Sequence, residues 1–251
     1  MDNNIKETQE LNIICGRNPV LEAVRSGREI DRLLVAHGTS GGTVTAIIAK
    51  CKAKGILIKE ISPQKLDYYC GGANHQGVAV FPASQEYSTV EDILNTAKER
   101  DEKPFIIICD EIEDPHNLGA IIRTAEASGV HGIIIPKRRS ASLNATVAKS
   151  ASGALEYMKV ARVTNIANTI DDLKEQGVWV FGADMDGEDY TKVDFDLPCA
   201  IVIGNEGKGI GNLTAKKCDR IISLPMKGKI NSLNASVAAG ILMYEAVRKR
   251  S

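Results

Sequence analysis

Short apolar runs, separated by glycine, proline and polar residues, divide the first eighty residues into alternating helix and strand patterns. Asn18-Pro19 has the form of a helix start, because asparagine caps helices well and proline suits the first helical position. Strands that alternate with helices predict a small α/β layer domain ending near Pro82. The expected elements are helices over residues 18–27, 43–54 and 63–70, and strands over residues 32–36, 56–61 and 78–81.

A second series of apolar runs begins at Pro104. Residues 105–110 (FIIICD) form a continuous apolar run, which is typical of a parallel strand covered on both faces. The alternation predicts a second, larger α/β domain. Its expected strands are residues 105–110, 132–136, 159–163, 178–183, 200–204 and 220–225, and its expected helices are residues 118–128, 143–157 (as one helix or two), 166–176 and 232–250.

Residues 84–103 differ from both series, because they contain six acids and three bases, a net charge of −3. We expect this segment to be a linker with one short helix. The predicted organisation is therefore a first domain over residues 1–83, an acidic linker over residues 84–103 and a second domain over residues 104–251.

The composition excludes several classes of protein. With 43% hydrophobic and 25% charged residues, the chain is neither disordered nor collagen-like. Its 31 basic and 32 acidic residues exclude a uniformly basic nucleic-acid binder but permit a local basic patch. The six cysteines form no Cys-x-x-Cys pair and no zinc-finger pattern with histidine, so we expect no disulfide framework and no metal. Without a bilayer-spanning apolar stretch or a signal-peptide pattern, we expect a cytoplasmic protein.

Ligands of open parallel sheets bind in loops beyond the carboxyl ends of the strands. The loop after Asp110 leads into a helix that begins near Asn117, whose side chain suits a helix cap. On a helical wheel the apolar residues share one face and Arg123 points away from it. Arg123 is therefore predicted to be exposed to solvent, where it is equally placed to meet a phosphate.

A glycine-rich loop, Gly-Asn-Glu-Gly-Lys-Gly-Ile-Gly, occupies residues 204–211. Its spacing matches neither a Walker loop nor a dinucleotide fingerprint. Glycines let a ligand approach the backbone, although a flexible turn has the same composition. Glu206 in the middle of the loop would repel phosphate, which favours a ligand with positive charge or hydroxyl groups.

The segment that follows the last predicted strand joins polar helix-start residues to basic ones. Ser232 or Asn231 can cap the last helix, and Asn234 suits its first turn, so these residues need no further role. Residues 204–230 contain six bases and two acids. A second basic cluster, Lys137-Arg138-Arg139, follows another strand. Charge runs are often only solvated surface, but two basic clusters beside strand-end loops favour a nucleic-acid partner.

Three motifs in this order resemble those of SpoU/TrmH-type RNA 2′-O-ribose methyltransferases of the SPOUT superfamily. They are Asn117-Leu-Gly-Ala-Ile-Ile-Arg123, Ile203-Gly-Asn-Glu206-Gly-Lys-Gly, and Leu224-Pro-Met226 with Ser232-Leu-Asn234-Ala-Ser-Val. Each motif is weak alone, but the three together are specific. The opening Gly16-Arg-Asn-Pro-Val-Leu-Glu-Ala is similar to the family's substrate-binding domain, so the resemblance covers nearly the whole chain. Pro136-Lys-Arg-Arg139 and the segment 145–154 most resemble the RlmB-like branch, which methylates a guanosine ribose in 23S ribosomal RNA.

The resemblance implies an α/β protein with a small L30e-like N-terminal domain and a SPOUT domain that ends in a deep trefoil knot. It also implies a homodimer formed through the knot domain, S-adenosylmethionine as cofactor and methyl transfer to a ribose 2′-hydroxyl of ribosomal RNA. The implied cofactor-binding residues are Gly204, Leu224, Met226 and Leu233. The implied catalytic residues are Arg123, Asn117, Glu206, Ser232 and Asn234, and the predicted RNA-binding residues are Lys137, Arg138, Arg139 and Lys208.

In the family a key role belongs to the arginine that matches Arg123. A guanidinium with a pKa above about 12 is a poor general base. We therefore expect Arg123 to clamp a phosphate and the reacting hydroxyl and to stabilise developing alkoxide. The proton would pass to the phosphate of the nucleotide or to a water molecule.

Three alternatives remain at this point. The first is a non-catalytic RNA-binding protein of the same fold, such as a ribosome-assembly factor. The second is a methyltransferase for transfer RNA or for another ribosomal loop. The third is a nucleotide-dependent α/β enzyme that binds NAD or ATP through the loop at Gly204.

Overall fold

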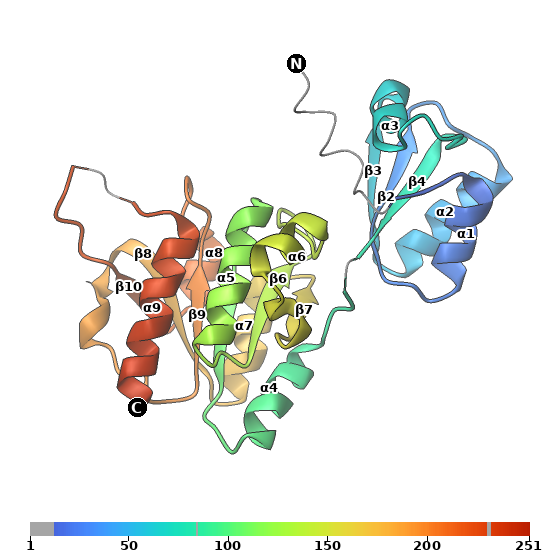
Figure 1. Cartoon of the computed structure of the whole chain (residues 1–251). Coiled ribbons are helices and arrows are strands. Elements are labelled where there is room, and N and C mark those ends of the chain that lie inside the picture. Colours follow the sequence, from blue (N-terminus) through green and yellow to red (C-terminus); the bar gives the residue numbers. More distant parts are fainter. Residues whose placement is uncertain (1–12, 84, 230–231) are drawn as a thin grey trace. The chain divides into compact units, whose positions relative to one another are not determined.

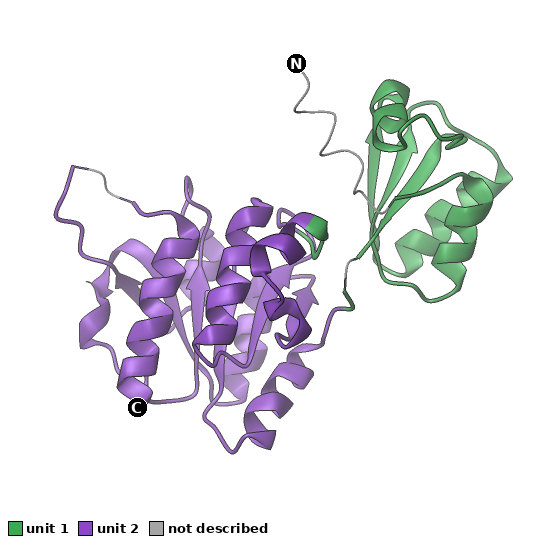
Figure 2. Ribbon diagram, viewed as in Figure 1, with its two compact units in different colours: residues 1–86, 142–145 green, residues 87–141, 146–251 purple. Residues whose placement is uncertain are grey.

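The computed structural model describes residues 13–83, 85–229 and 232–251. By its internal contacts the chain divides into two compact units (Figure 2). Unit 1 contains the chain up to Glu86 together with residues 142–145, and unit 2 contains residues 87–141 and 146–251. Among the described residues, no helix is long and apolar enough to cross a membrane.

Unit 1 is a four-stranded sheet with helices on both faces (Figure 1). The strand order is β1-β4-β2-β3, with β2 and β3 parallel and β4 antiparallel to β1 and β2. An aliphatic core lies between the sheet and the first two helices, and the third helix packs on the opposite face. The elements are β1 (Ile14–Cys15), α1 (Arg17–Arg25), β2 (Ile30–Ala36), α2 (Gly42–Ala53), β3 (Leu57–Ile61), α3 (Pro63–Tyr69) and β4 (Val78–Pro82). The predicted small α/β domain is confirmed, and only β1, two residues long, has no counterpart in the predicted pattern.

Unit 2 is built on a six-stranded parallel sheet in the order β10-β8-β9-β5-β6-β7. Its central strand β5 (Phe105–Cys109) is buried along its whole length, as the continuous apolar run predicts. The other strands are β6 (Gly132–Pro136), β7 (Val160–Val163), β8 (Trp179–Asp189), β9 (Cys199–Ile203) and β10 (Arg220–Ser223). The helices are α4 (Val90–Glu99), α5 (Pro115–Ala127), α6 (Ala145–Ala151), α7 (Ile166–Glu175), α8 (Asn212–Lys217) and α9 (Ala235–Arg250), with short 3₁₀ turns at 154–156 and 190–192.

The segment predicted as an acidic linker with one short helix does contain one helix, α4, but from Tyr87 onward it belongs to unit 2. Thr89 caps α4 in a reciprocal capping box with Asp92. Ile93 and Ala97, one turn apart, are fully buried, and Ile93 occupies the space left by Gly132, where a Cβ atom would lie 2.4 Å from it. Because α4 carries acids on its solvent side, the composition of the segment does not reveal this narrow apolar face.

Helix ends also differ from the sequence predictions. α5 begins at Pro115, and its cap is Asp114, whose carboxylate accepts from the His116 N–H, so Asn117 lies inside the first turn and is buried. α9 begins at Ala235 and is capped by Asn234 instead of Ser232. Asn231, the alternative cap, lies outside the described residues. The side chain of Asn234 accepts from two backbone N–H groups, which makes it the better cap.

Candidate functional site

Residues 183–185 of β8, the loops after β9 and β10 and one side of α9 enclose a cavity of about 340 Å³ at the carboxyl edge of the unit 2 sheet. This volume lies in the usual range for small-molecule sites, about 300–1,000 Å³. All four residues predicted to bind the cofactor line it, and so do three of the others singled out in the sequence. These seven residues are Gly204, Leu224, Met226 and Leu233, with Glu206, Lys208 and Ser232.

The glycine-rich loop folds back on itself at the floor of the cavity. The backbones of Asn205 and Gly209 exchange hydrogen bonds of 3.0 and 2.8 Å. Gly209 has a φ of +66°, and a Cβ atom on Gly204 would lie 2.2 Å from the Gly209 carbonyl carbon. Both positions therefore require glycine, and their bare backbone is left facing the cavity.

Glu206 holds three segments of the chain together. Its Oε1 accepts hydrogen bonds from Asn117 Nδ2 at 2.8 Å, from the Ala235 N–H at 3.2 Å and from Asn234 Nδ2. Asn234 Nδ2 also donates to Asn117 Oδ1 at 2.9 Å. The structure thus brings three of the predicted catalytic residues together, and their mutual bonds fix the loop between α5 and α9.

Asp110 provides a second anchor for the same loop. This buried carboxylate stands at the end of β5, and its Oδ2 accepts from the Gly211 N–H at 2.9 Å. Asn205 adds a third contact, because its Nδ2 donates to the Glu111 carbonyl at 3.1 Å. Anchors at both ends make the loop a pre-formed wall of the cavity.

Arg123 does not line this cavity. It is exposed on α5, as the helical wheel predicts, and its guanidinium donates to Ser152 Oγ at 3.4 Å. Leu118, Ile121, Ile122 and Ala125, the predicted apolar face, are all buried. Within one chain, Arg123 therefore stands outside the wall that holds the predicted cofactor residues.

The basic residues predicted to bind RNA lie in two places. Lys208 lines the cavity, whereas Lys137, Arg138 and Arg139 follow β6. Arg138 is exposed, and Arg139 forms an ion pair of 2.8 Å with Glu111, which raises the pKa of the Arg139 guanidinium. Because Arg139 already has an acidic partner, Arg138 is the more available cation of this cluster.

Sequence reasoning missed two residues within β8, Asp184 and Met185, which also line the cavity. The predicted strand ends at residue 183, and a strand end was the signal for these positions, although β8 continues to Asp189. Asp184 has no hydrogen-bond or ion-pair partner among the described residues, and its Oδ2 would lie 2.9 Å from a Cβ atom on Gly209. It is therefore a carboxylate held against the glycine loop and left available to a ligand.

The lining suits a ligand with cationic, hydroxyl and apolar parts. Asp184 and Glu206 supply carboxylates, the glycine loop supplies bare backbone, and Leu224, Met226 and Leu233 supply apolar contacts. S-adenosylmethionine has this chemistry, with a sulfonium, an ammonium group, ribose hydroxyls and an adenine ring. The described residues contain no group of three or more side chains suited to a metal ion.

Comparison with known proteins gives matches over both units. Residues 104–244 match the SpoU rRNA Methylase family, and residues 13–88 match the domain described as RNA 2′-O ribose methyltransferase substrate binding. A Bacillus subtilis protein named as a TrmH family tRNA/rRNA methyltransferase is 49% identical over 245 residues, which are 97% of this chain and 98% of that protein. A Staphylococcus aureus protein with the same family name is 46% identical over 239 residues, 95% of this chain and 96% of that protein.

Solved structures extend the comparison to the cofactor. The SpoU methyltransferase AviRb from Streptomyces viridochromogenes, in complex with AdoMet, is 25% identical and superposes with a TM-score of 0.62 over 99% of both chains. An AdoMet-bound rRNA methyltransferase from Sinorhizobium meliloti is 26% identical, with a TM-score of 0.59 over 98% of this chain and 95% of that one. A TrmH/SpoU tRNA modifying enzyme from A. aeolicus is 28% identical, with a TM-score of 0.55, and covers 59% of this chain and 76% of its own.

Proposed function

Because this chain belongs to the SpoU rRNA methylase family, it is an S-adenosylmethionine-dependent RNA 2′-O-ribose methyltransferase, and we propose that its substrate is a guanosine in large-subunit (23S) ribosomal RNA. The AdoMet-bound neighbours confirm the predicted cofactor over NAD or ATP. The neighbour named as an rRNA methyltransferase matches both units, whereas the tRNA enzyme covers only 59% of the chain. This chain therefore shares both of its units with the rRNA enzyme but not with the tRNA enzyme, which favours a ribosomal substrate.

The cavity at the carboxyl edge is the proposed cofactor site. When bound, S-adenosylmethionine supplies an electrophilic methyl group on its sulfonium. We assign Gly204, Leu224, Met226 and Leu233 to its binding, through backbone groups and apolar contacts. Asp184, the carboxylate without a partner among the described residues, is the proposed acceptor for a cationic or hydroxyl group of the cofactor.

Glu206, Asn117 and Asn234 are proposed to position the site. The three hydrogen bonds on Glu206 Oε1 leave that oxygen fully engaged within the chain, so Glu206 acts through the loop that it fixes. Ser232, exposed beside the cavity, is assigned to orient the ribose or the methionine part of the cofactor. The proposal includes the family's trefoil knot, with the loop at 204–211 held between α5 and α9.

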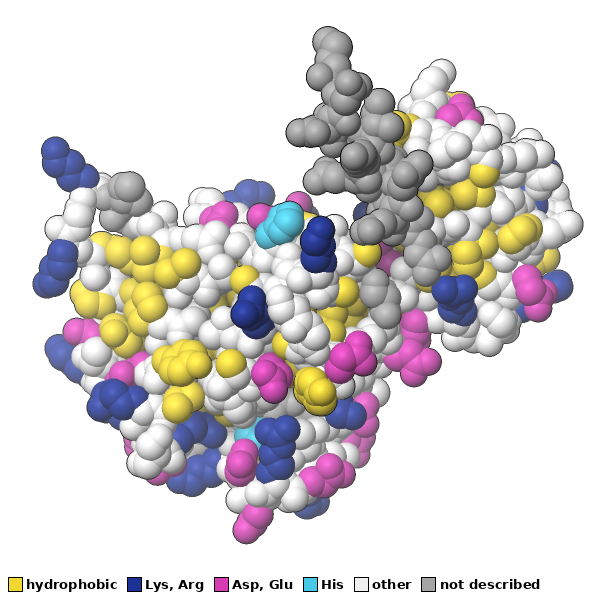
Figure 3. Space-filling model, viewed as in Figure 1, with side chains coloured by type: hydrophobic (Ala, Val, Ile, Leu, Met, Phe, Trp, Pro, Cys, Tyr) yellow, Lys and Arg dark blue, Asp and Glu magenta, His cyan; other side chains and the backbone are white. Residues whose placement is uncertain are grey.

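Arg123 is proposed to act on the RNA. Its guanidinium contacts the phosphate beside the target ribose and stabilises alkoxide character on the 2′-oxygen, while the proton passes to that phosphate or to a water molecule. Since Arg123 lies outside the cavity of its own chain, the proposal places it at the site of a second copy in a homodimer. α9 offers a surface for this contact, because Val237, Ile241 and Tyr244 are 49%, 38% and 53% exposed along it. Figure 3 shows hydrophobic side chains, in yellow, gathered on this side of unit 2.

The test is methyl transfer from labelled S-adenosylmethionine to deproteinised large-subunit RNA that lacks its native modifications, with bulk transfer RNA assayed in parallel. The modified position is mapped by cleavage that ribose methylation blocks. A single 2′-O-methylguanosine in the large-subunit RNA is the expected result. Methylation of transfer RNA alone, or of another base, would overturn the proposed substrate. Cofactor binding with no transfer to either RNA or to an assembling large subunit would favour the non-catalytic assembly factor.

A further inference from the structure

The aromatic residues of unit 1 gather on one face of its sheet. Residues 1–86 contain only three, Tyr68, Tyr69 and Phe81. The Tyr69 and Phe81 rings meet edge to face with centroids 5.7 Å apart, and the Tyr68 and Tyr69 rings do so at 6.0 Å. None of the three is fully buried, and Tyr68 is 57% exposed. Tyr69 and Phe81 pack on one side against the buried cluster beneath α3, and their exposed parts together with Tyr68 leave aromatic surface in water.

Cations stand over these rings. The guanidinium carbon of Arg32 lies 5.6 Å from the centre of the Phe81 ring, and Lys65 Nζ lies 6.0 Å from that of Tyr69. The register places Phe81 of β4 directly opposite Arg32 of β2. Lys59 of β3 lies opposite Leu34, two residues along β2 from Arg32, so it belongs to the same face.

The opposite face of the sheet is built differently. There α1 and α2 close over an aliphatic core that contains Val20, Leu33, Val44 and Ile47 and no aromatic side chain. On the aromatic face, the cations Arg32, Lys59 and Lys65 meet Asp31, which pairs with Arg32 at 2.7 Å, while Asp67 of α3 is paired with His75 at 2.9 Å. This face, made of Arg32, Lys59, Lys65, Tyr68, Tyr69 and Phe81, is named here the basic–aromatic face.

We propose that the basic–aromatic face binds unpaired nucleotides of the RNA substrate, with bases stacked on Tyr69, Phe81 and the Arg32 guanidinium and with phosphates near Lys59 and Lys65. Single-stranded RNA is recognised by stacking on aromatic rings and arginine planes, whereas the bases of a duplex are already stacked on one another. The occupant is therefore a loop or bulge, not a helix. The inference rests on the proposed RNA-modifying function and adds the surface that selects the RNA.

The test compares the full-length protein with three double variants. Tyr69→Leu with Phe81→Leu keeps apolar packing and removes the rings. Lys59→Gln with Lys65→Gln removes the cations. Lys50→Gln with Lys52→Gln is the matched control, because these exposed lysines lie on α2, across the sheet. The Kd for deproteinised large-subunit RNA is measured for each protein over a series of salt concentrations.

The ring variant is expected to weaken binding about tenfold or more, with an unchanged salt slope, because stacking releases no counterions. The Lys59/Lys65 variant is expected to lower that slope by roughly one to two units, at about 0.7 per phosphate contact on single strands. The control stays within about twofold of the unmodified protein, as expected for surface changes away from the interface. Ring and Lys59/Lys65 variants that bind as tightly as the control at every salt concentration would overturn the inference.

Two further readouts separate this inference from the proposed substrate and from misfolding. S-adenosylmethionine binding by calorimetry reports whether the ring variant is folded, and ultraviolet cross-linking of the unmodified protein to the RNA needs no variant. Cross-links on the peptides that contain Tyr68, Tyr69 or Phe81 are expected, and cross-links confined to other peptides would contradict the proposal. If the protein binds transfer RNA instead, the proposed ribosomal substrate is wrong. The same variants are then compared on transfer RNA, so the proposal for the basic–aromatic face is still tested. Binding of neither RNA would overturn both proposals.

Discussion

At the scale of single residues, the exposure of Arg123 separates its role in the reaction from any role in folding. The side chain stands on the solvent face of α5, outside the cofactor cavity. Arg123→Ala should therefore retain the Kd for S-adenosylmethionine and lower turnover on bound RNA about 100- to 1,000-fold, the usual loss for one charge-stabilising donor. Glu126→Gln, an exposed change one turn along α5, is the control and should retain activity. Normal turnover of Arg123→Ala at saturating RNA would remove Arg123 from the mechanism.

The two carboxylates of the cavity should respond differently to substitution. Asp184 has no partner among the described residues, so Asp184→Asn should leave the Tm unchanged and raise the cofactor Kd about tenfold, or 1.4 kcal/mol. Glu206 accepts three hydrogen bonds within the chain, so Glu206→Ala should destabilise unit 2 by about 2–3 kcal/mol. Calorimetry and thermal unfolding measure the two effects, with the exposed Asp186→Asn as the control for charge alone. An unchanged cofactor Kd in Asp184→Asn would place the ligand's polar groups elsewhere.

His131 makes the stability of unit 2 depend on pH. Its Nδ1 accepts from the Phe105 N–H at 2.9 Å and its Nε2 bonds Glu102 at 2.8 Å, so the folded chain holds the ring neutral. Burial lowers the pKa of His131 below its usual value, against the opposing effect of Glu102. The unfolded chain therefore binds the proton more readily, and the stabilisation that is complete above about pH 6.5 is lost as the pH falls below it.

We accordingly expect the urea midpoint to decrease between pH 7.5 and pH 5.5. The carboxylates with lowered pKa values, such as Asp92 and Asp196, titrate at lower pH and do not contribute in this window. His131→Gln should reduce the dependence of the urea midpoint on pH, although the variant is less stable than the unmodified protein. A His131→Gln midpoint that decreases as steeply as that of the unmodified protein would assign the effect to other groups.

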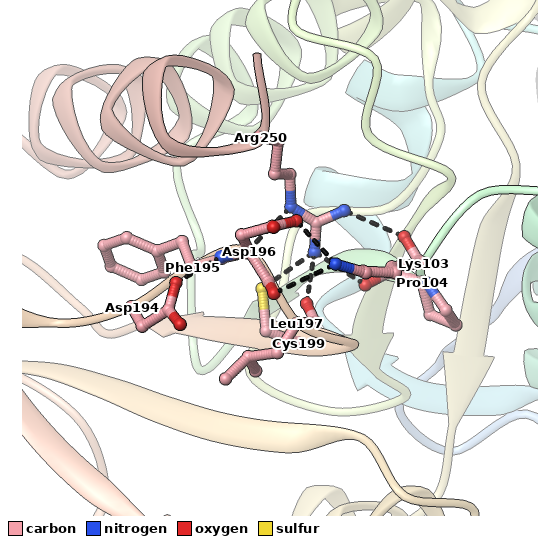
Figure 4. Close-up of polar contacts among 8 residues, drawn as sticks. All are labelled: Lys103, Pro104, Asp194, Phe195, Asp196, Leu197, Cys199 and Arg250. Carbon is pink, nitrogen blue, oxygen red and sulfur yellow. Dashed lines mark hydrogen bonds and ion pairs between the residues drawn. The ribbon is translucent and has the colours of Figure 1, made fainter.

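At the scale of elements, one side chain binds the C-terminal end of α9 to the segments that precede β5 and β9 in the unit 2 sheet. The guanidinium of Arg250 donates to the carbonyls of Lys103, Pro104, Phe195 and Leu197 at 2.6–3.0 Å (Figure 4). It also lies 4.7 Å from the centre of the Phe105 ring. Because α9 also carries Asn234 at its other end, this contact fixes the helix that closes the cofactor site.

Arg250→Ala should therefore destabilise unit 2 by about 3 kcal/mol, since several charge-assisted hydrogen bonds are lost and carbonyls are left unpaired. Arg250→Lys should recover only part of this, because an ammonium group cannot match the planar fork. Arg248→Ala, two residues earlier, removes an exposed arginine paired with Glu245 and should leave the stability nearly unchanged. Equal losses of stability in Arg250→Ala and Arg248→Ala would show that the carbonyl contacts add little.

The elements that the sequence predicted are those with enough residues to show a period. α5 has four apolar positions on one face, and β5 has a five-residue apolar run. α8 has six residues and one buried side chain, Thr214, which leaves no period to detect. The extension of β8 to Asp189 contains a glycine and several acids, and it pairs with β10 only after a shift in register. Its strand character depends on that neighbour and not on its own residues.

At the scale of the whole molecule, the candidate site depends on contacts between distant parts of the chain. Glu206 bonds Asn117, 89 residues earlier, and Asn234, 28 residues later. Periodicity carries no information on such pairs, and only the family resemblance joined the three motifs. Asp184 was missed for the same reason, because its place in the site depends on its position beside Gly209 on the neighbouring loop. The two-unit organisation and the end of the first unit, predicted at residue 83 and found at Glu86, were predictable. The start of the second unit was not, because α4 is acidic outside and apolar only along Ile93 and Ala97.

The last prediction concerns the proposed homodimer, in which each active site combines the cofactor cavity of one chain with Arg123 of the other. Ile241→Asp places a charge on the exposed apolar stripe of α9 and should reduce the mass measured by light scattering from dimer to monomer, whereas Leu213→Asp on α8 should not.

An equal mixture of Arg123→Ala and Asp184→Asn chains, refolded together, then tests where Arg123 acts. If it acts on the partner's cofactor site, mixed dimers contain one intact site and recover about one quarter of the unmodified activity at limiting cofactor. If each chain uses its own Arg123, every site contains one of the two substitutions and mixing restores nothing.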